Sequence, residues 1–141
     1  MFRYCIFYQE PSARYQTLNH MKKIIIVEDD TFLQGLIAGK LSKEGFTVIS
    51  VADGGQANAK IEEETPDLVL LDLMVPGVDG FGVLEKVRST DTVKNTPVII
   101  FSNLGEEKDI TRAKELGATD FMVKSNFTLD ELALKIKEIL G

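Results

Sequence analysis

The amino-acid sequence predicts an α/β fold in which helices cover both faces of a five-stranded parallel sheet. Two observations carry this prediction. Short apolar runs rich in Ile, Leu and Val recur after residue 22, as is typical of strands buried on both faces. The segments between them are long enough for helices and place apolar residues at helical spacing. Such alternation favours a parallel sheet with right-handed helical crossovers.

Five apolar segments are the predicted strands. They are residues 24–27, 46–51, 68–71, 98–101 and 121–123. The second segment alternates apolar and polar residues more than the others, which are continuous apolar runs. Continuous runs are expected where helices cover both faces of a sheet, because every side chain of the strand is then buried.

Five helices are predicted between and after these strands. Their apolar positions are Phe32, Leu33, Leu36, Ile37 and Leu41 in the first, Ala57 and Ile61 in the second, Phe81, Leu84 and Val87 in the third, Ile110, Ala113 and Leu116 in the fourth, and Leu129, Leu132, Ala133, Ile136, Ile139 and Leu140 in the fifth. Thr128 and Glu131 are spaced for a capping box at the start of the fifth helix. Thr31 and Gln34 have the same spacing at the first helix, and Gly117 is expected to end the fourth.

The composition excludes several classes of protein. The 141 residues are one domain's worth, and 44% hydrophobic with 27% charged residues is typical of a globular protein. No apolar run exceeds five residues, so no segment is expected to cross a membrane. Cys5 and His20 are the only residues of their types, which excludes a disulfide framework and cysteine- or histidine-rich metal sites. A net charge of −6 argues against direct binding to nucleic acid.

Residues 1–20 differ from the remainder of the chain. They contain all three tyrosines and carry a charge of +1, against −6 for the whole chain, which leaves −7 for residues 21–141. Arg3, Gln9 and Glu10 interrupt their apolar residues, which is unlike a signal peptide. We expect an N-terminal extension or leader at 1–20, disordered or loosely packed, followed by one domain at 21–141.

Chemically reactive side chains follow four of the predicted strands. They are Glu28, Asp29 and Asp30 after the first strand, Asp72 after the third, Ser102 after the fourth and Lys124 after the fifth. Because the carboxyl ends of parallel strands share one edge of a sheet, these side chains are expected to lie together. Grouped carboxylates repel one another, and a hard divalent cation such as Mg²⁺ or Mn²⁺ relieves the repulsion. A carboxylate can also attack phosphorus to form an aspartyl phosphate, whose charge a lysine and a hydroxyl would offset.

Five segments, in this order and at this spacing, carry a resemblance to a known family. They are residues 24–30, 70–80, 100–103, 117–118 and 123–124, which read IIIVEDD, LLDLMVPGVDG, IFSN, GA and VK. On these segments, residues 22–141 resemble the receiver domain of two-component response regulators, a CheY-like family. The resemblance implies a flavodoxin-like (βα)5 doubly wound fold with strand order 2-1-3-4-5.

The resemblance also implies roles for the acidic residues and the loop that follows the third strand. Asp72 would accept the phosphoryl group. Glu28 and Asp29 would bind Mg²⁺, one directly and the other directly or through water, with Mn²⁺ as a substitute. Met74 would offer its backbone carbonyl to the metal, and Asp30 is better placed as a helix N-cap.

The resemblance also implies roles for the residues at the ends of the fourth and fifth strands. Ser102 would close on the phosphoryl group and Lys124 would pair with it. Phe121 matches an aromatic switch position that turns inward on activation, together with the movement of Ser102. The family commonly has a proline after the lysine, often in a cis peptide bond, whereas this chain has Ser125. The sequence therefore leaves the direction of the Lys124 side chain open.

By this resemblance the chain is a stand-alone receiver, not a classical enzyme, that catalyses its own phosphorylation and its own aspartyl-phosphate hydrolysis. A histidine kinase or histidine phosphotransfer protein would be the donor, in the cytoplasm. The signal would pass by phosphorelay, or by contact with an output protein at the face formed by the fourth helix, fifth strand and fifth helix. The domain would be a monomer or a weak dimer, and an excised domain of a longer protein stays an alternative.

Other classes fit the sequence less well. A receiver-like interaction module that is never phosphorylated usually lacks the acceptor or the lysine, and both are present here as Asp72 and Lys124. A haloacid-dehalogenase-type phosphatase needs a second aspartate where this chain has Met74. A flavin carrier needs a phosphate-binding loop after the first strand, where the acidic residues 28–30 would repel phosphate.

Overall fold

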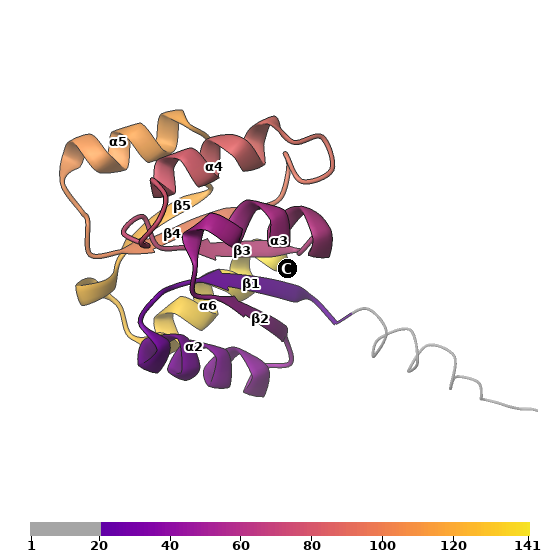
Figure 1. Ribbon diagram of the computed structural model, residues 1–141. Helices are drawn as coiled ribbons and strands as arrows, with labels where there is room; N and C mark the ends of the chain where they lie inside the picture. Colours follow the sequence, from indigo (N-terminus) through magenta and orange to yellow (C-terminus); the bar gives the residue numbers. More distant parts are fainter. Residues whose placement is uncertain (1–20) are drawn as a thin grey trace, which may run out of the picture.

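The computed structural model describes residues 21–141, in which strands and helices alternate along the chain (Figure 1). The extension expected at residues 1–20 lies outside this described part. The elements are β1 Lys23–Val27, α2 Thr31–Lys43, β2 Thr47–Val51, η1 Gly54–Gln56, α3 Ala57–Glu64, β3 Leu68–Leu71, α4 Gly80–Ser89, β4 Val98–Ser102, α5 Glu107–Glu115, β5 Asp120–Val123, η2 Lys124–Asn126 and α6 Leu129–Leu140, where η1 and η2 are short 3₁₀ helices. No helix of residues 21–141 is long and apolar enough to span a bilayer.

The five strands form one parallel sheet in the order β2-β1-β3-β4-β5, which confirms the predicted fold and strand order. Every predicted strand is present, and its ends differ from the prediction by at most one residue. In Figure 1, α3, α4 and α5 lie above the sheet and α2 and α6 lie below it. Both faces are therefore covered, as the continuous apolar strands require.

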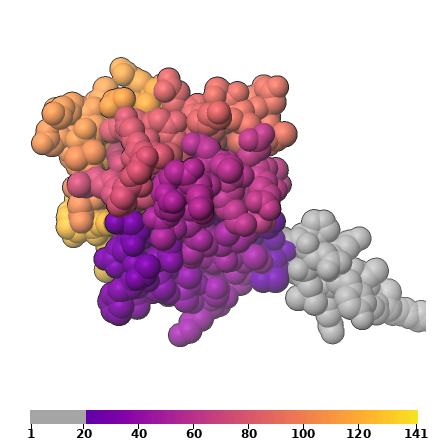
Figure 2. All heavy atoms as spheres, viewed as in Figure 1, coloured from indigo at the N-terminus to yellow at the C-terminus, as the bar shows by residue number. Residues whose placement is uncertain are grey.

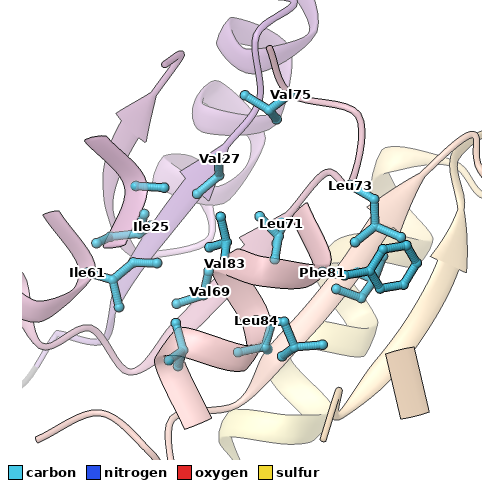
Figure 3. Packing of buried hydrophobic residues seen from close by; sticks show 14 of the residues in the cluster. Ile25, Val27, Ile61, Val69, Leu71, Leu73, Val75, Phe81, Val83 and Leu84 are labelled. Carbon is cyan, nitrogen blue, oxygen red and sulfur yellow. The ribbon is translucent and has the colours of Figure 1, made fainter. Parts of the chain in front are cut away.

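Alternate residues of the strands pack into two apolar clusters, one on each face of the sheet. Ile25 and Val27 of β1 belong to the cluster formed with α3, α4 and α5, part of which Figure 3 shows. Ile24 and Ile26 belong to the cluster formed with α2 and α6. All four side chains are at most 1% exposed. Because burial of each such side chain contributes about 1.5–3 kcal/mol, the ends of these strands are firmly placed.

The predicted helix ends are confirmed at the fourth and fifth helices. The Thr128 hydroxyl accepts a hydrogen bond from the Glu131 N–H at 3.1 Å, and the Glu131 carboxylate accepts one from the Thr128 N–H at 2.8 Å. This is the expected capping box of α6. Gly117 follows the last turn of α5 with a φ of 98°, a left-handed conformation that glycine adopts without strain.

The capping box predicted at Thr31 and Gln34 is wrong. The N-cap role expected for Asp30 is confirmed instead, because its carboxylate accepts hydrogen bonds from the N–H groups of Phe32 and Leu33 at the start of α2. Because these first-turn N–H groups already have an acceptor, Thr31 lies inside the helix. The Gln34 side chain does not reach back to the cap, and instead donates to the Glu28 carbonyl at 2.9 Å.

The apolar stripe predicted for the first helix is only partly buried. Ile37 and Leu41 of α2 are buried in the core. Phe32 is 76% exposed and Leu36 is 45% exposed, so these two side chains face solvent. The spacing predicted the helix correctly, but two of its apolar residues lie outside the core.

The loop between β3 and α4 is fixed by a close contact at Gly80, the first residue of α4. A Cβ atom placed on Gly80 would lie 2.5 Å from the Leu73 Cα atom and 2.8 Å from the Leu73 carbonyl oxygen. No side chain fits there without displacing the backbone just after Asp72. Gly82, two residues on in the same helix, is open, since the nearest atom to its Cβ would be 4.0 Å away.

We expect Gly80→Ala to lower the free energy of unfolding by about 2–3 kcal/mol, because its methyl group would overlap the backbone of Leu73. The matched control Gly82→Ala should leave stability unchanged or raise it by up to about 1 kcal/mol, because alanine favours the helix. Urea denaturation of both variants measures the difference. Equal stability of the two variants would contradict the close contact at Gly80.

Candidate functional site

The register of the sheet brings the acidic residues after β1 and β3 together. Val27 of β1 lies opposite Leu71 of β3, so the next residues, Glu28 and Asp72, leave the sheet side by side. The backbone N–H of Asp72 donates to the Val27 carbonyl at 3.0 Å. The N–H of Glu28 donates to the carbonyl of Val51 on β2, also at 3.0 Å. The sheet therefore fixes the backbone of both acids.

Lys124 reaches this pair of acids from the end of β5. Its Nζ lies 2.7 Å from the Oδ2 atom of Asp72 and 2.6 Å from the Oε1 atom of Glu28. The three side chains are nearly buried, with 14%, 6% and 3% exposed for Lys124, Asp72 and Glu28. Ser125, where the family commonly has proline, lies in the turn η2. The direction that the sequence left open is thus toward Asp72.

Three carboxylates at this edge have the arrangement of a divalent cation site. Glu28, Asp29 and Asp72 each offer an oxygen atom, and these atoms lie within 4.8 Å of one another. Figure 2 shows this edge at the left of the molecule, where the indigo segment after β1 meets the yellow segment before α6 at the surface. All the ligand atoms are oxygens, which are the atoms that Mg²⁺ and Mn²⁺ prefer.

Burial and hydrogen bonding distinguish the two acids after β1. Both oxygens of Glu28 are engaged, one with Lys124 and the other with the Asp30 N–H at 3.1 Å. Burial raises the pKa of Glu28 above its usual value, although the bonds from Lys124 and the Asp30 N–H act in the opposite direction. Asp29 is exposed, and within residues 21–141 no hydrogen bond or ion pair engages its carboxylate. Asp29 is thus the acid most available to a ligand from solvent.

Lys124 and Asp72 stabilise each other. Burial opposes the charge of Lys124, but its hydrogen bonds to Asp72 and Glu28 outweigh that effect and raise the pKa of the ammonium group. The other oxygen of Asp72 accepts a hydrogen bond from the Met74 N–H at 2.9 Å. Lys124 is therefore charged at neutral pH and lies against the predicted phosphoacceptor.

The remaining predicted residues are Ser102, Phe121 and Met74. Ser102 ends β4, fully buried, and its hydroxyl oxygen accepts a hydrogen bond from the Leu104 N–H at 3.2 Å. Phe121 of β5 is half-buried and packs against the core cluster beneath α5. The Met74 side chain is 59% exposed, so only its backbone turns toward Asp72. The structure brings Glu28, Asp29, Asp72 and Lys124 into one group. Ser102 ends β4 opposite Val123, the residue before Lys124, whereas Phe121 pairs with Ile100 further back in the sheet.

Sequence reasoning missed one contact that links the site loop to α5. The guanidinium of Arg112 on α5 lies 4.2 Å from the centre of the Phe81 ring and 3.8 Å from the carboxylate of Asp79. Asp79 caps α4 through the Phe81 N–H. No local sequence pattern pairs Arg112 with residues more than thirty positions away, because the contact depends on how α4 and α5 lie on the sheet.

Comparisons with known proteins point to one family. Residues 24–137 match the family model described as response regulator receiver domain. The probable transcriptional regulator ycf27 of Guillardia theta is 35% identical over 123 residues, which cover 87% of this chain and 47% of the relative. The phosphate regulon transcriptional regulatory protein PhoB of Rhizobium meliloti is 35% identical over 120 residues, which cover 85% and 52%. The chain thus spans about half the length of these curated relatives.

Solved structures of similar fold are also receiver domains. The BeF3-activated N-terminal receiver domain of Klebsiella pneumoniae RstA superposes with a TM-score of 0.77 at 32% identity, covering 84% of this chain and 97% of that one. The receiver domain of the sensor histidine kinase PA1611 of Pseudomonas aeruginosa has a TM-score of 0.77 at 27% identity, covering 86% and 98%. That structure holds a magnesium ion coordinated in its active-site cleft.

The raised pKa of Glu28 predicts a pH effect on stability. An acid whose pKa is higher in the folded chain contributes stability that is fully present below its unfolded value of 4.5 and is lost as the pH rises above it. Glutamine cannot ionise, so Glu28→Gln should gain stability relative to the wild type as the pH is raised from 4.5 toward neutral in the presence of chelator.

Urea denaturation at a series of pH values measures this gain. Glu62→Gln, which replaces an exposed acid on α3, is the reference measured in the same way. The quantity compared is the free energy of unfolding of Glu28→Gln minus that of the wild type. If this difference stays constant or falls as the pH rises, burial does not dominate the pKa of Glu28.

Proposed function

The chain belongs to the response regulator receiver domain family, and from this premise we propose that Asp72 is its phosphoacceptor. Proteins of this family are signalling proteins. One observation supports the proposal above others: the Asp72 carboxylate lies against Lys124 and beside two further acids at the edge of the sheet. A phosphohistidine of a histidine kinase or histidine phosphotransfer protein is the proposed donor.

The residues at this edge fit a Mg²⁺ ion, with Mn²⁺ as a substitute. Asp29 and Asp72 would hold the ion together with the Met74 backbone carbonyl. Glu28, whose oxygens already bond to Lys124 and the Asp30 N–H, would act through a water molecule. When bound, the ion neutralises the carboxylates and offsets the charge on the transferring phosphoryl group.

The proposed reaction transfers a phosphoryl group between two side chains. A carboxylate oxygen of Asp72 attacks phosphorus, the bond from phosphorus to the donor imidazole nitrogen breaks, and that nitrogen keeps the electron pair and takes up a proton. Lys124 is positioned to neutralise a phosphoryl oxygen, and the Ser102 hydroxyl to donate to another. Attack by water on the same phosphorus later returns the Asp72 carboxylate and releases phosphate, which ends the signal.

The contact with the donor would include exposed apolar side chains that lie close in sequence to the site residues. Three exposed apolar side chains each lie within three positions of a proposed site residue: Phe32 after Asp29, Met74 after Asp72 and Phe127 after Lys124. They are 76%, 59% and 39% exposed. We propose that these three side chains take part in the contact with the phosphohistidine donor.

The proposed output follows from the position of Ser102. Movement of Ser102 toward a phosphoryl group would shift the segment before α5 and allow Phe121 to turn inward, which biases a two-state equilibrium. The face formed by α5, β5 and α6 would then contact an output protein, or the phosphoryl group would pass on by relay. We propose residues 21–141 as the signalling unit, cytoplasmic and monomeric or weakly dimeric, without direct contact with nucleic acid.

The acceptor is tested by intact mass after incubation with acetyl phosphate and Mg²⁺. We expect one phosphoryl adduct in the wild type, none in Asp72→Asn and none with chelator. Asp91→Asn removes an acid that is 96% exposed, and should be labelled like the wild type. Labelling of Asp72→Asn to the wild-type level would exclude Asp72, and an unlabelled wild type would favour an interaction module that is not phosphorylated.

The switch role of Ser102 is tested with beryllium fluoride as a phosphoryl mimic. Ser102→Ala should still form the adduct with acetyl phosphate, because the acids and Lys124 are unchanged. The NMR shift changes that beryllium fluoride causes in α5 and β5 should shrink in this variant and persist in Ser102→Thr, which keeps the hydroxyl. Equal shift changes in all three proteins would remove Ser102 from the switch.

A further inference from the structure

Gln34, in the first turn of α2, donates two hydrogen bonds to the segment that carries Asp29. Its backbone N–H donates to the Asp30 carbonyl at 2.8 Å. Its side-chain amide donates to the Glu28 carbonyl at 2.9 Å. The first bond is the ordinary helix bond that any residue at position 34 would make. The second is specific to the glutamine side chain and holds the carbonyl just before Asp29.

Asp29 differs from the other two carboxylates in how it is held. Glu28 and Asp72 are buried, contact Lys124 and have their backbone N–H groups in the sheet. Asp29 is exposed, follows the last residue bonded to the sheet, and within residues 21–141 has no side-chain hydrogen bond or ion pair. Its position therefore depends on the backbone of residues 28–30, which Gln34 fixes.

We propose that Gln34 is a positioning residue for Asp29 and thereby sets the affinity of the site for divalent cations. The inference rests on the proposed function only in taking Asp29 as a metal ligand. Gln34 does not contact the ion. Because it fixes the backbone of Asp29 before the ion binds, less conformational entropy of the chain is lost on binding.

The size of the effect follows from other metal sites. Loss of a side chain that orients a metal ligand typically weakens binding by about 10–100-fold. Gln34 orients the backbone of the ligand and not its carboxylate, so we place its effect near the lower end, at about 10-fold. Saturation with metal should compensate for the loss, because the ligands and Lys124 remain.

The test is direct Mn²⁺ binding to the full chain, measured by electron paramagnetic resonance of the free ion without a phosphodonor. Gln34→Met keeps the shape of the side chain and removes its N–H donor, and should raise the Kd for Mn²⁺ about 10-fold. Labelling by acetyl phosphate should need correspondingly more Mg²⁺ and reach the wild-type level at saturation. Gln56→Met is the matched control, because Gln56 is exposed and its side chain makes no capping hydrogen bond.

A second variant separates positioning from simple charge. Gln34→Glu adds a negative charge close to the site, which by Coulomb attraction alone would tighten cation binding. It also removes the donor to the Glu28 carbonyl, so we expect weaker binding of Mn²⁺. Tighter binding by Gln34→Glu would overturn the positioning role.

Two further measurements distinguish the remaining explanations: the melting temperature in chelator, and Mn²⁺ binding by the wild type and by Asp29→Asn. A lower melting temperature of Gln34→Met in chelator, with an unchanged Kd for Mn²⁺, would show a structural role only and overturn the inference. Wild-type binding that Asp29→Asn abolishes would support the metal site even if both Gln34 variants bind normally. A wild type that binds no Mn²⁺ would overturn this inference and the proposed metal site together.

Discussion

The pairing of one lysine with two buried carboxylates is the interaction on which the carboxyl edge of the sheet depends. Lys124 contacts both Glu28 and Asp72, and all three side chains are nearly buried. A buried carboxylate without a partner costs several kcal/mol, so these acids are tolerable only while the ammonium group lies between them. That position requires β1, β3 and β5 to end at the same edge, which the parallel register provides.

The strands and the charged group could be predicted from the sequence because both depend on short segments. An apolar run such as residues 68–71 marks a buried strand, and the residue after it marks the edge of the sheet. Asp72 and Lys124 were therefore identifiable without knowing the contact between them. The apolar spacing of residues 32–41 predicted α2 equally well, but it did not reveal that Phe32 is exposed, since spacing reports a helix and not its neighbours.

The contacts that the sequence could not predict depend on the packing of distant segments, or on competition between neighbouring side chains for the same hydrogen bonds. Thr31 and Gln34 fit a capping box, but the neighbouring Asp30 caps the helix first, which leaves the Gln34 amide free to bind the Glu28 carbonyl. The requirement for glycine at position 80 arises from the approach of the Leu73 backbone. Arg112 meets Phe81 only because α4 and α5 lie on the same face of the sheet.

The contact between Arg112 and Phe81 has a consequence for how evenly two conformations would be populated. An exposed cation–π contact contributes about 0.5–1 kcal/mol, and the Arg112 side chain is 57% exposed. If the proposed switch displaces α5 from α4, breaking this contact alone would disfavour the displaced conformation by a factor of about two to five. Under the proposed switch, substitution of Arg112 would thus change the balance between the two conformations by a small factor and would abolish neither.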